Sequence, residues 1–175
     1  MMNLKLTEFD NLYKSILSSE TTDKNKDQFY KIGMSLIETY DAYRIRETFL
    51  SKLLVIFPND ALLMYYMGHI NLGVSNSKAM MWFNFSLRQD PNFVECILDY
   101  LKILFDNDMF GAIAAYNKEN NDILYKINDN RVRLIVASYE GKMRNFERSI
   151  RKYLDIISSG RKNVTQLLFL CAIVM

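Results

Sequence analysis

Residues 58–91 read PNDALLMYYMGHINLGVSNSKAMMWFNFSLRQDP, and this stretch decides the fold. A proline stands at each end, and proline lacks an amide donor and disfavours helix in the residue before it. Between the prolines, two apolar segments with helical spacing flank the turn sequence GVSNS at residues 73–77. The stretch therefore predicts one helical hairpin, with helices at about 60–73 and 77–89.

The same arrangement recurs along the chain. Pro58 and Pro91 lie 33 residues apart, and an asparagine follows each of them. Gly33 and Gly68 lie 35 residues apart. Self-similarity at such a spacing is typical of helical-repeat proteins, whose units bury their apolar faces by stacking.

Helical periodicity extends over most of the remaining sequence. Phe9, Leu12 and Ile16 share one face of a helix predicted at 7–19, and a polar loop is expected at 19–28. Further helices are predicted at about residues 25–40, 43–57, 92–106, 109–118, 130–142, 145–158 and 163–175. No segment alternates apolar and polar residues between turns, so no strand is predicted.

The hairpin at 58–91 resembles a tetratricopeptide (TPR) unit, a repeat of 34 residues with two helices. In that family a small residue lies midway along the first helix, where the second helix crosses close by, and Gly68 fills this place. The second-helix positions of the pattern are matched by Ala79, Phe83, Ser86 and Pro91. Small residues let the two backbones approach, and the aromatic side chain fills the space between hairpins.

Weaker copies of the pattern extend the resemblance over about residues 25–162. They are carried by Gly33, by Leu101, Ala112 and Tyr116, and by Ala137, Ser149 and Tyr153. The resemblance implies an all-α fold, a right-handed stack of antiparallel helical hairpins (a TPR-like α-solenoid) with about four hairpins plus flanking helices. An N-terminal helix and polar loop at 1–24 would precede a repeat array at 25–175. A Sel1-like hairpin repeat is the alternative.

The last nine residues, LLFLCAIVM at 167–175, are apolar and carry no polar cap. Helical arrays usually finish with a polar capping repeat, so we expect the array to continue beyond residue 175 in the native protein. If it does not, a partner or a second copy is expected to cover the C-terminal apolar helix, which would make a homo-oligomer.

Charge and cysteine content limit the plausible functions. The chain has 22 basic and 20 acidic residues, a balance that argues against nucleic-acid binding and against an anionic membrane surface. The basic group around Arg148, Arg151 and Lys152 is interpreted as a solvated helix face. Cys96 and Cys171 are interpreted as buried thiols in a reducing, cytoplasmic environment.

Catalytic and metal-binding motifs are not found in the sequence. His69 is the one histidine, and there is no Cys-x-x-Cys pair and no glycine-rich phosphate loop. We therefore expect this segment to be no enzyme and to carry no cofactor and no metal site.

A binding surface is the remaining candidate. In arrays of the resembled family, the first helices line a concave groove that receives peptides. By this resemblance the groove residues are Tyr30, Met34, Tyr65, His69, Leu98, Lys102, Ser138 and Lys142. Leu134 and the outer positions Glu38, Gly73 and Asp106 belong to the same pattern. Lys102 and Lys142 could hold a carboxylate, although packing against neighbouring helices is an equal alternative for each groove residue.

The leading hypothesis is a non-catalytic protein–protein interaction module that binds a peptide or partner domain in a concave groove. One alternative is the N-terminal substrate-selecting or assembly region of a larger enzyme, such as an O-linked N-acetylglucosamine transferase-like glycosyltransferase. A second alternative is an RNA-binding helical repeat, against which the charge balance argues.

Overall fold

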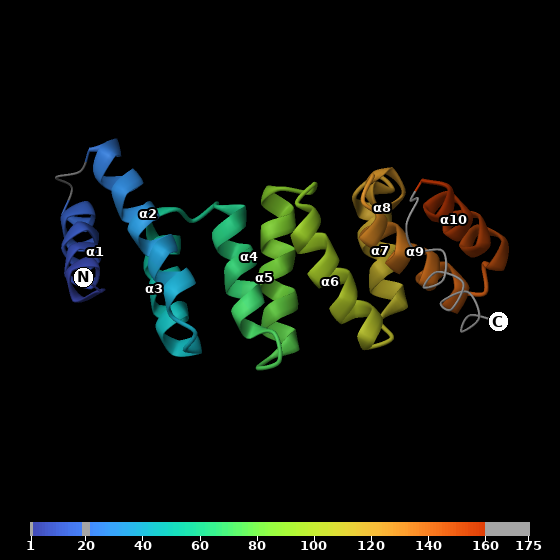
Figure 1. The fold of residues 1–175 in the computed structure, drawn as a ribbon, viewed down its shortest axis with the longest axis horizontal. Coiled ribbons are helices and arrows are strands. Elements are labelled where there is room, and N and C mark those ends of the chain that lie inside the picture. Colours follow the sequence, from blue (N-terminus) through green and yellow to red (C-terminus); the bar gives the residue numbers. More distant parts are fainter. Residues whose placement is uncertain (1, 19–21, 160–175) are drawn as a thin grey trace. The chain divides into compact units, whose positions relative to one another are not determined.

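The chain is all α-helical in the part that the computed structural model describes, residues 2–18 and 22–159 (Figure 1). In chain order the helices are α1 (Met2–Leu17), α2 (Asp23–Thr39), α3 (Tyr43–Ile56), α4 (Ala61–Asn71), α5 (Asn76–Gln89), α6 (Val94–Asp106), α7 (Phe110–Glu119), α8 (Ile123–Lys126), α9 (Asn130–Lys142) and α10 (Phe146–Ser159). This confirms the all-α prediction and the absence of strands among the described residues. The helix predicted at 163–175, including Cys171, lies outside them.

Helix ends follow local capping chemistry. Asp60 caps α4, where its carboxylate accepts a 2.9 Å hydrogen bond from the Leu63 amide, as its place after Pro58 predicts. Thr22 caps α2, which therefore starts inside the segment predicted as a polar loop. Asn92 was expected to start α6, but Phe93 is the residue before that helix and makes no side-chain cap.

The short helix α8 was not predicted. Asn117 of α7 holds it: the Asn117 side chain accepts a 3.1 Å hydrogen bond from the Leu124 amide and donates a 2.9 Å bond to Asp122. Asn121 and Asp122 have left-handed backbone conformations, which these residue types tolerate better than most. A side chain from the preceding helix thus stabilises one turn that has no periodic pattern of its own.

The chain divides into two compact units, Met1–Gln89 and Asp90–Met175. In the first unit each helix from α1 to α5 packs on the next one along the chain. In the second unit α6 packs on α7 and α9, α8 packs on α7 and α9, and α10 packs on α9. Sequential packing of neighbouring helices accounts for most of the fold in both units.

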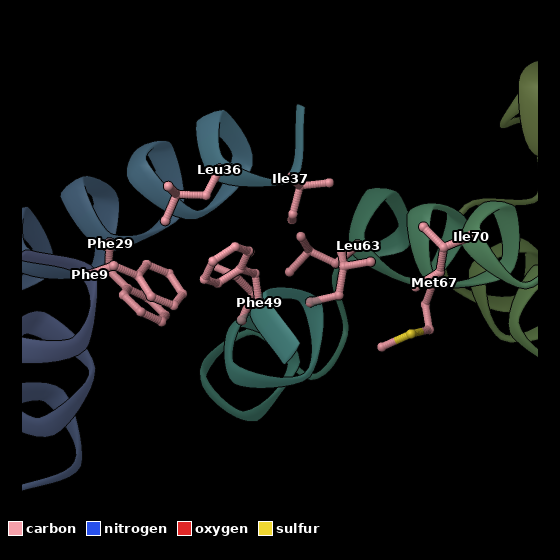
Figure 2. Packing of buried hydrophobic residues seen from close by; sticks show 10 residues of the cluster. Phe9, Phe29, Leu36, Ile37, Phe49, Leu63, Met67 and Ile70 are labelled. Atoms are coloured by element: carbon pink, nitrogen blue, oxygen red, sulfur yellow. The ribbon is translucent and has the colours of Figure 1, made fainter. Parts of the chain in front are cut away.

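Three phenylalanine rings form the centre of the first unit (Figure 2). Phe9 of α1 stacks on Phe29 of α2 with ring centroids 4.4 Å apart, and it meets Phe49 of α3 edge-on at 5.3 Å. Seven further residues complete the buried cluster: Leu36, Ile37, Leu50, Leu53, Leu63, Met67 and Ile70. Helix α1 is therefore part of this core, because its Phe9 side chain is completely buried in it.

Two hairpins each contain a hydrogen bond from a serine hydroxyl to the backbone of the other helix, at different positions along the hairpin. Ser86 of α5 donates a 2.7 Å bond to the Ala61 carbonyl of α4, and Ser149 of α10 donates a 2.8 Å bond to the Ala137 carbonyl of α9. Both serines are buried, as the repeat pattern predicted for small second-helix residues. Small side chains bring the helices close enough for a hydroxyl to reach the neighbouring backbone.

Candidate partner-binding surface

Helices α6 and α9 carry half of the predicted groove residues, and they pack directly against each other. The guanidinium of Arg131, near the start of α9, holds both carboxylate oxygens of Glu95, near the start of α6, at 3.1 Å. Both helices start at the top of the view in Figure 1, so they run side by side in the same direction. The bidentate pair fixes their register at that end.

The predicted lysines lie on the helix faces that this ion pair joins. At 3.6 residues per turn, positions 7 and 11 residues further along a helix return to the same face. Counting from Glu95 reaches Lys102 and Asp106, and counting from Arg131 reaches Ser138 and Lys142. We call this surface the α6–α9 face; it comprises Glu95, Leu98, Lys102 and Asp106 of α6, and Arg131, Leu134, Ser138 and Lys142 of α9.

The two lysines of the α6–α9 face are available to a ligand. Lys102 and Lys142 are exposed, and the side chain of neither forms a hydrogen bond or an ion pair with any described residue. Leu98 and Leu134 are half-buried beside them. The face therefore combines unpaired positive charge with partly accessible apolar surface.

Ser138 has a structural contact. Its hydroxyl lies 2.9 Å from the hydroxyl of Tyr153, a residue of α10 that is almost fully buried. The interaction joins α9 to α10 inside their hairpin. For each predicted groove residue, packing against a neighbouring helix was the alternative to binding a partner. Ser138 packs in this way.

In the first unit, Tyr30 and Met34 of α2 pack against the buried cluster. The Tyr30 ring meets Phe57 edge-on at 5.2 Å. Burial raises the pKa of the Tyr30 hydroxyl, and the negative charge of the neighbouring Asp60 carboxylate raises it further. Tyr30 therefore packs α2 against the residue that follows α3.

Tyr65 and His69 of α4 form an aromatic pair, with ring centroids 5.9 Å apart. His69 is exposed, whereas the half-buried Tyr65 also contacts Phe83 of α5 at 5.9 Å. The outer position Glu38 is exposed, and Gly73 follows α4 in a left-handed turn conformation with φ of 76°. His69 is thus the most accessible of the predicted groove residues in the first unit.

A polar cavity between α8 and α10 was missed from the sequence. It is open to solvent, measures about 430 Å³, and is lined by Asp122, Tyr125, Arg148, Arg151, Lys152 and Asp155. From the sequence, Arg148, Arg151 and Lys152 were interpreted as a solvated helix face. They lie on α10 and line this open cavity. Three cations and two carboxylates line it, and Arg151 also pairs with Glu147 at 2.9 Å, so the charges nearly balance.

Tyr125, which lines this cavity, is hydrogen-bonded to a buried carboxylate. Glu140 of α9 is almost completely buried and accepts hydrogen bonds from the Tyr125 hydroxyl at 2.6 Å and from the Asn145 amide at 2.8 Å. Burial raises the pKa of Tyr125, and its bond to Glu140 raises it further. The Lys152 ammonium lies 4.2 Å from the centre of the Tyr125 ring, and burial lowers the pKa of this lysine.

Among the described residues, no group of three His, Cys, Asp or Glu side chains is arranged to hold a metal ion. None of the helices in this part of the chain is long and apolar enough to cross a membrane. No protein-family model and no curated protein matches the sequence. The functional assignment therefore depends on the surfaces of the molecule itself.

Proposed function

We propose that this protein is a non-catalytic interaction module that binds a peptide or partner domain on its α6–α9 face. The observation that carries the proposal is the placement of Lys102 and Lys142, exposed and unpaired, on two parallel helices in register. Parallel first helices are what a TPR-like stack of hairpins requires. The close approach of α4 and α5 at Gly68 and Phe83, and of α9 and α10 at Ala137 and Ser149, supports that architecture.

The chemistry of the α6–α9 face defines the partner. Two ammonium groups attract carboxylates, either acidic side chains or a chain terminus. Leu98 and Leu134 offer apolar contact next to them. We infer that the partner segment pairs carboxylate groups with an apolar side chain. The buried thiol of Cys96 supports a reducing, cytoplasmic setting for this interaction.

The test is peptide selection followed by charge reversal. Peptides selected from a random display library on the wild-type protein are measured by calorimetry against the double variant Lys102→Glu/Lys142→Glu. We expect the Kd to rise by about tenfold or more, a loss of about 1.4 kcal/mol.

The matched control is Lys78→Glu/Lys118→Glu, which makes the same charge change at exposed lysines of α5 and α7. This variant is expected to bind the selected peptides like wild type. An unchanged Kd in the α6–α9 variant, or an equal loss in the control, contradicts the proposed face. Circular dichroism of both variants checks that helicity is retained.

A further inference from the structure

The cavity between α8 and α10 is large enough for a small molecule. Its volume of about 430 Å³ lies within the range of about 300–1,000 Å³ that is usual for ligand pockets. All six lining residues are polar or aromatic, and five of them carry a charge at neutral pH. Gaps left by imperfect packing between helices are apolar instead. A ligand of this cavity is therefore recognised by its charge.

Two of the three cations in the cavity have no anionic partner. Arg148 and Lys152 form no ion pair with any described residue, whereas Arg151 pairs with Glu147. Arg148 and Lys152 stand four residues apart on α10, so their side chains are neighbours on one helix face. Like charges in this arrangement repel each other. An anion bound between the two side chains would remove the repulsion.

Both of these cations lie near the ring of Tyr125 on α8. The Lys152 ammonium is 4.2 Å from the ring centroid. Burial and the Glu140 carboxylate raise the pKa of the Tyr125 hydroxyl, and the nearby positive charge of Arg148 opposes them. Burial also lowers the pKa of Lys152, because it takes water away from the ammonium, and the charge of Arg148 lowers it further. A partly desolvated ammonium without an ion pair is costly, and a bound anion would offset that cost.

The carboxylates near the cavity leave the two cations free. Asp122, at the start of α8, accepts a 2.9 Å hydrogen bond from the Asn117 amide. Glu140 is buried and is not among the lining residues. Asp155 lies one turn beyond Lys152 on α10, is exposed, and forms no ion pair with a described residue. Asp155 therefore repels an anion held at the two cations, so its removal should strengthen binding.

We propose that the cavity between α8 and α10 binds a small anion, whose phosphate or carboxylate group lies between Arg148 and Lys152. The guanidinium can donate two parallel hydrogen bonds to such a group, and the ammonium adds a point charge. The exposed part of the Tyr125 ring and the remaining volume leave room for an organic portion of the ligand. No residue of this site belongs to the α6–α9 face, so the two binding proposals stand or fall separately.

Nuclear magnetic resonance titration of the full chain at constant pH, with sodium phosphate and separately with sodium acetate, tests the site. We expect saturable shifts of the signals of Tyr125, Arg148 and Lys152, which sodium chloride at the same ionic strength does not produce. The anion with the lower Kd identifies the group, phosphate or carboxylate, that the site prefers. Shifts that do not saturate, that arise elsewhere in the chain, or that chloride reproduces overturn the proposal.

Two variants with opposite expected effects separate binding from folding. Arg148→Gln/Lys152→Met removes both charges while the methionine keeps apolar length over the aromatic ring, and it is expected to raise the Kd at least about tenfold. Asp155→Asn removes the repelling charge and is expected to lower the Kd about threefold or more. The control Lys78→Met/Arg88→Gln, at exposed residues of α5, is expected to bind like wild type.

The sign of the Asp155→Asn effect decides the charge of the ligand, because a residue with only a structural role would not strengthen binding when replaced. A Kd that rises in Asp155→Asn would indicate a ligand with a positive charge and overturns the proposal. A Kd that stays unchanged in Arg148→Gln/Lys152→Met, or that rises equally in the α5 control, overturns it as well.

Discussion

Gly68 of α4 lies directly against the ring of Phe83 of α5. A β-carbon at position 68 would be 2.5 Å from both the Cδ1 and the Cε1 atoms of that ring, far inside van der Waals contact. Phe83 is completely buried, and protein interiors are close-packed, so the ring cannot move aside without disturbing its neighbours. The glycine is needed here because the second helix approaches closely, and its backbone is ordinary α-helix.

Gly68→Ala is therefore expected to destabilise the protein by about 1–3 kcal/mol, because the ring and the two helices must shift to admit one methyl group. The overpacking outweighs the gain of up to about 1 kcal/mol that alanine brings to a helix interior. Urea unfolding followed by circular dichroism measures the change.

The control for this substitution is Gly111→Ala in α7, where nothing lies within 4 Å of the added carbon. There the free energy of unfolding is expected to stay equal or to rise by up to about 1 kcal/mol. Adding Phe83→Leu to Gly68→Ala is expected to recover part of the loss. A Gly68→Ala variant as stable as wild type would show that the α4–α5 crossing is looser than described.

Tyr125→Phe is expected to cost about 1–3 kcal/mol, because it removes the hydroxyl that donates to the buried Glu140 carboxylate. Tyr139→Phe is the control, since the Tyr139 hydroxyl donates to no described residue. The raised pKa of Tyr125 sets a pH dependence: the stabilisation is complete below pH 10. It declines as the pH rises above about 10, where the unfolded tyrosine loses its proton first. If Tyr125→Phe and Tyr139→Phe lowered the free energy of unfolding equally and only slightly, the hydrogen bond between Tyr125 and Glu140 would not stabilise the fold as described.

Asp129→Ala is expected to cost about 1 kcal/mol at pH 7, because Asp129 caps α9 by accepting a 2.8 Å bond from the Arg131 amide. Its hydrogen bonds with Arg131 hold the pKa of the Asp129 carboxyl below its usual value. The stabilisation is therefore present above about pH 4 and is lost as the pH falls through the lowered pKa. Asp129→Asn, which keeps a capping oxygen, is expected to lose less. A stability difference between wild type and Asp129→Ala that stays constant down to pH 2 would contradict this account.

Most helix boundaries could be predicted because their causes are local. Pro58, Pro91 and the capping residues Asp60 and Asp129 act within one turn of the helices that they end or begin. The four residues of α8 escaped prediction because a side chain from α7 stabilises them. One helical turn has no apolar periodicity that could indicate it.

The structure divides the predicted groove residues into exposed ones and ones that pack against other parts of the fold. Lys102 and Lys142 lie exposed on neighbouring helices, as a binding surface requires, whereas Ser138 contacts Tyr153 and Tyr30 packs against Phe57. No sequence pattern distinguishes these cases, because an exposed and a packed side chain can occupy the same helical phase.

The sequence by itself determined the all-α class, the places where helices start and stop, and the small and aromatic positions at which helices cross, such as Gly68 and Phe83. These follow from backbone chemistry and from the 3.6-residue period, and both act between near neighbours. Only the tertiary structure decided that Arg131 pairs with Glu95 and that Tyr125 reaches the buried Glu140. Each of these depends on which helix faces which, and that is set when the apolar faces of all the helices pack together.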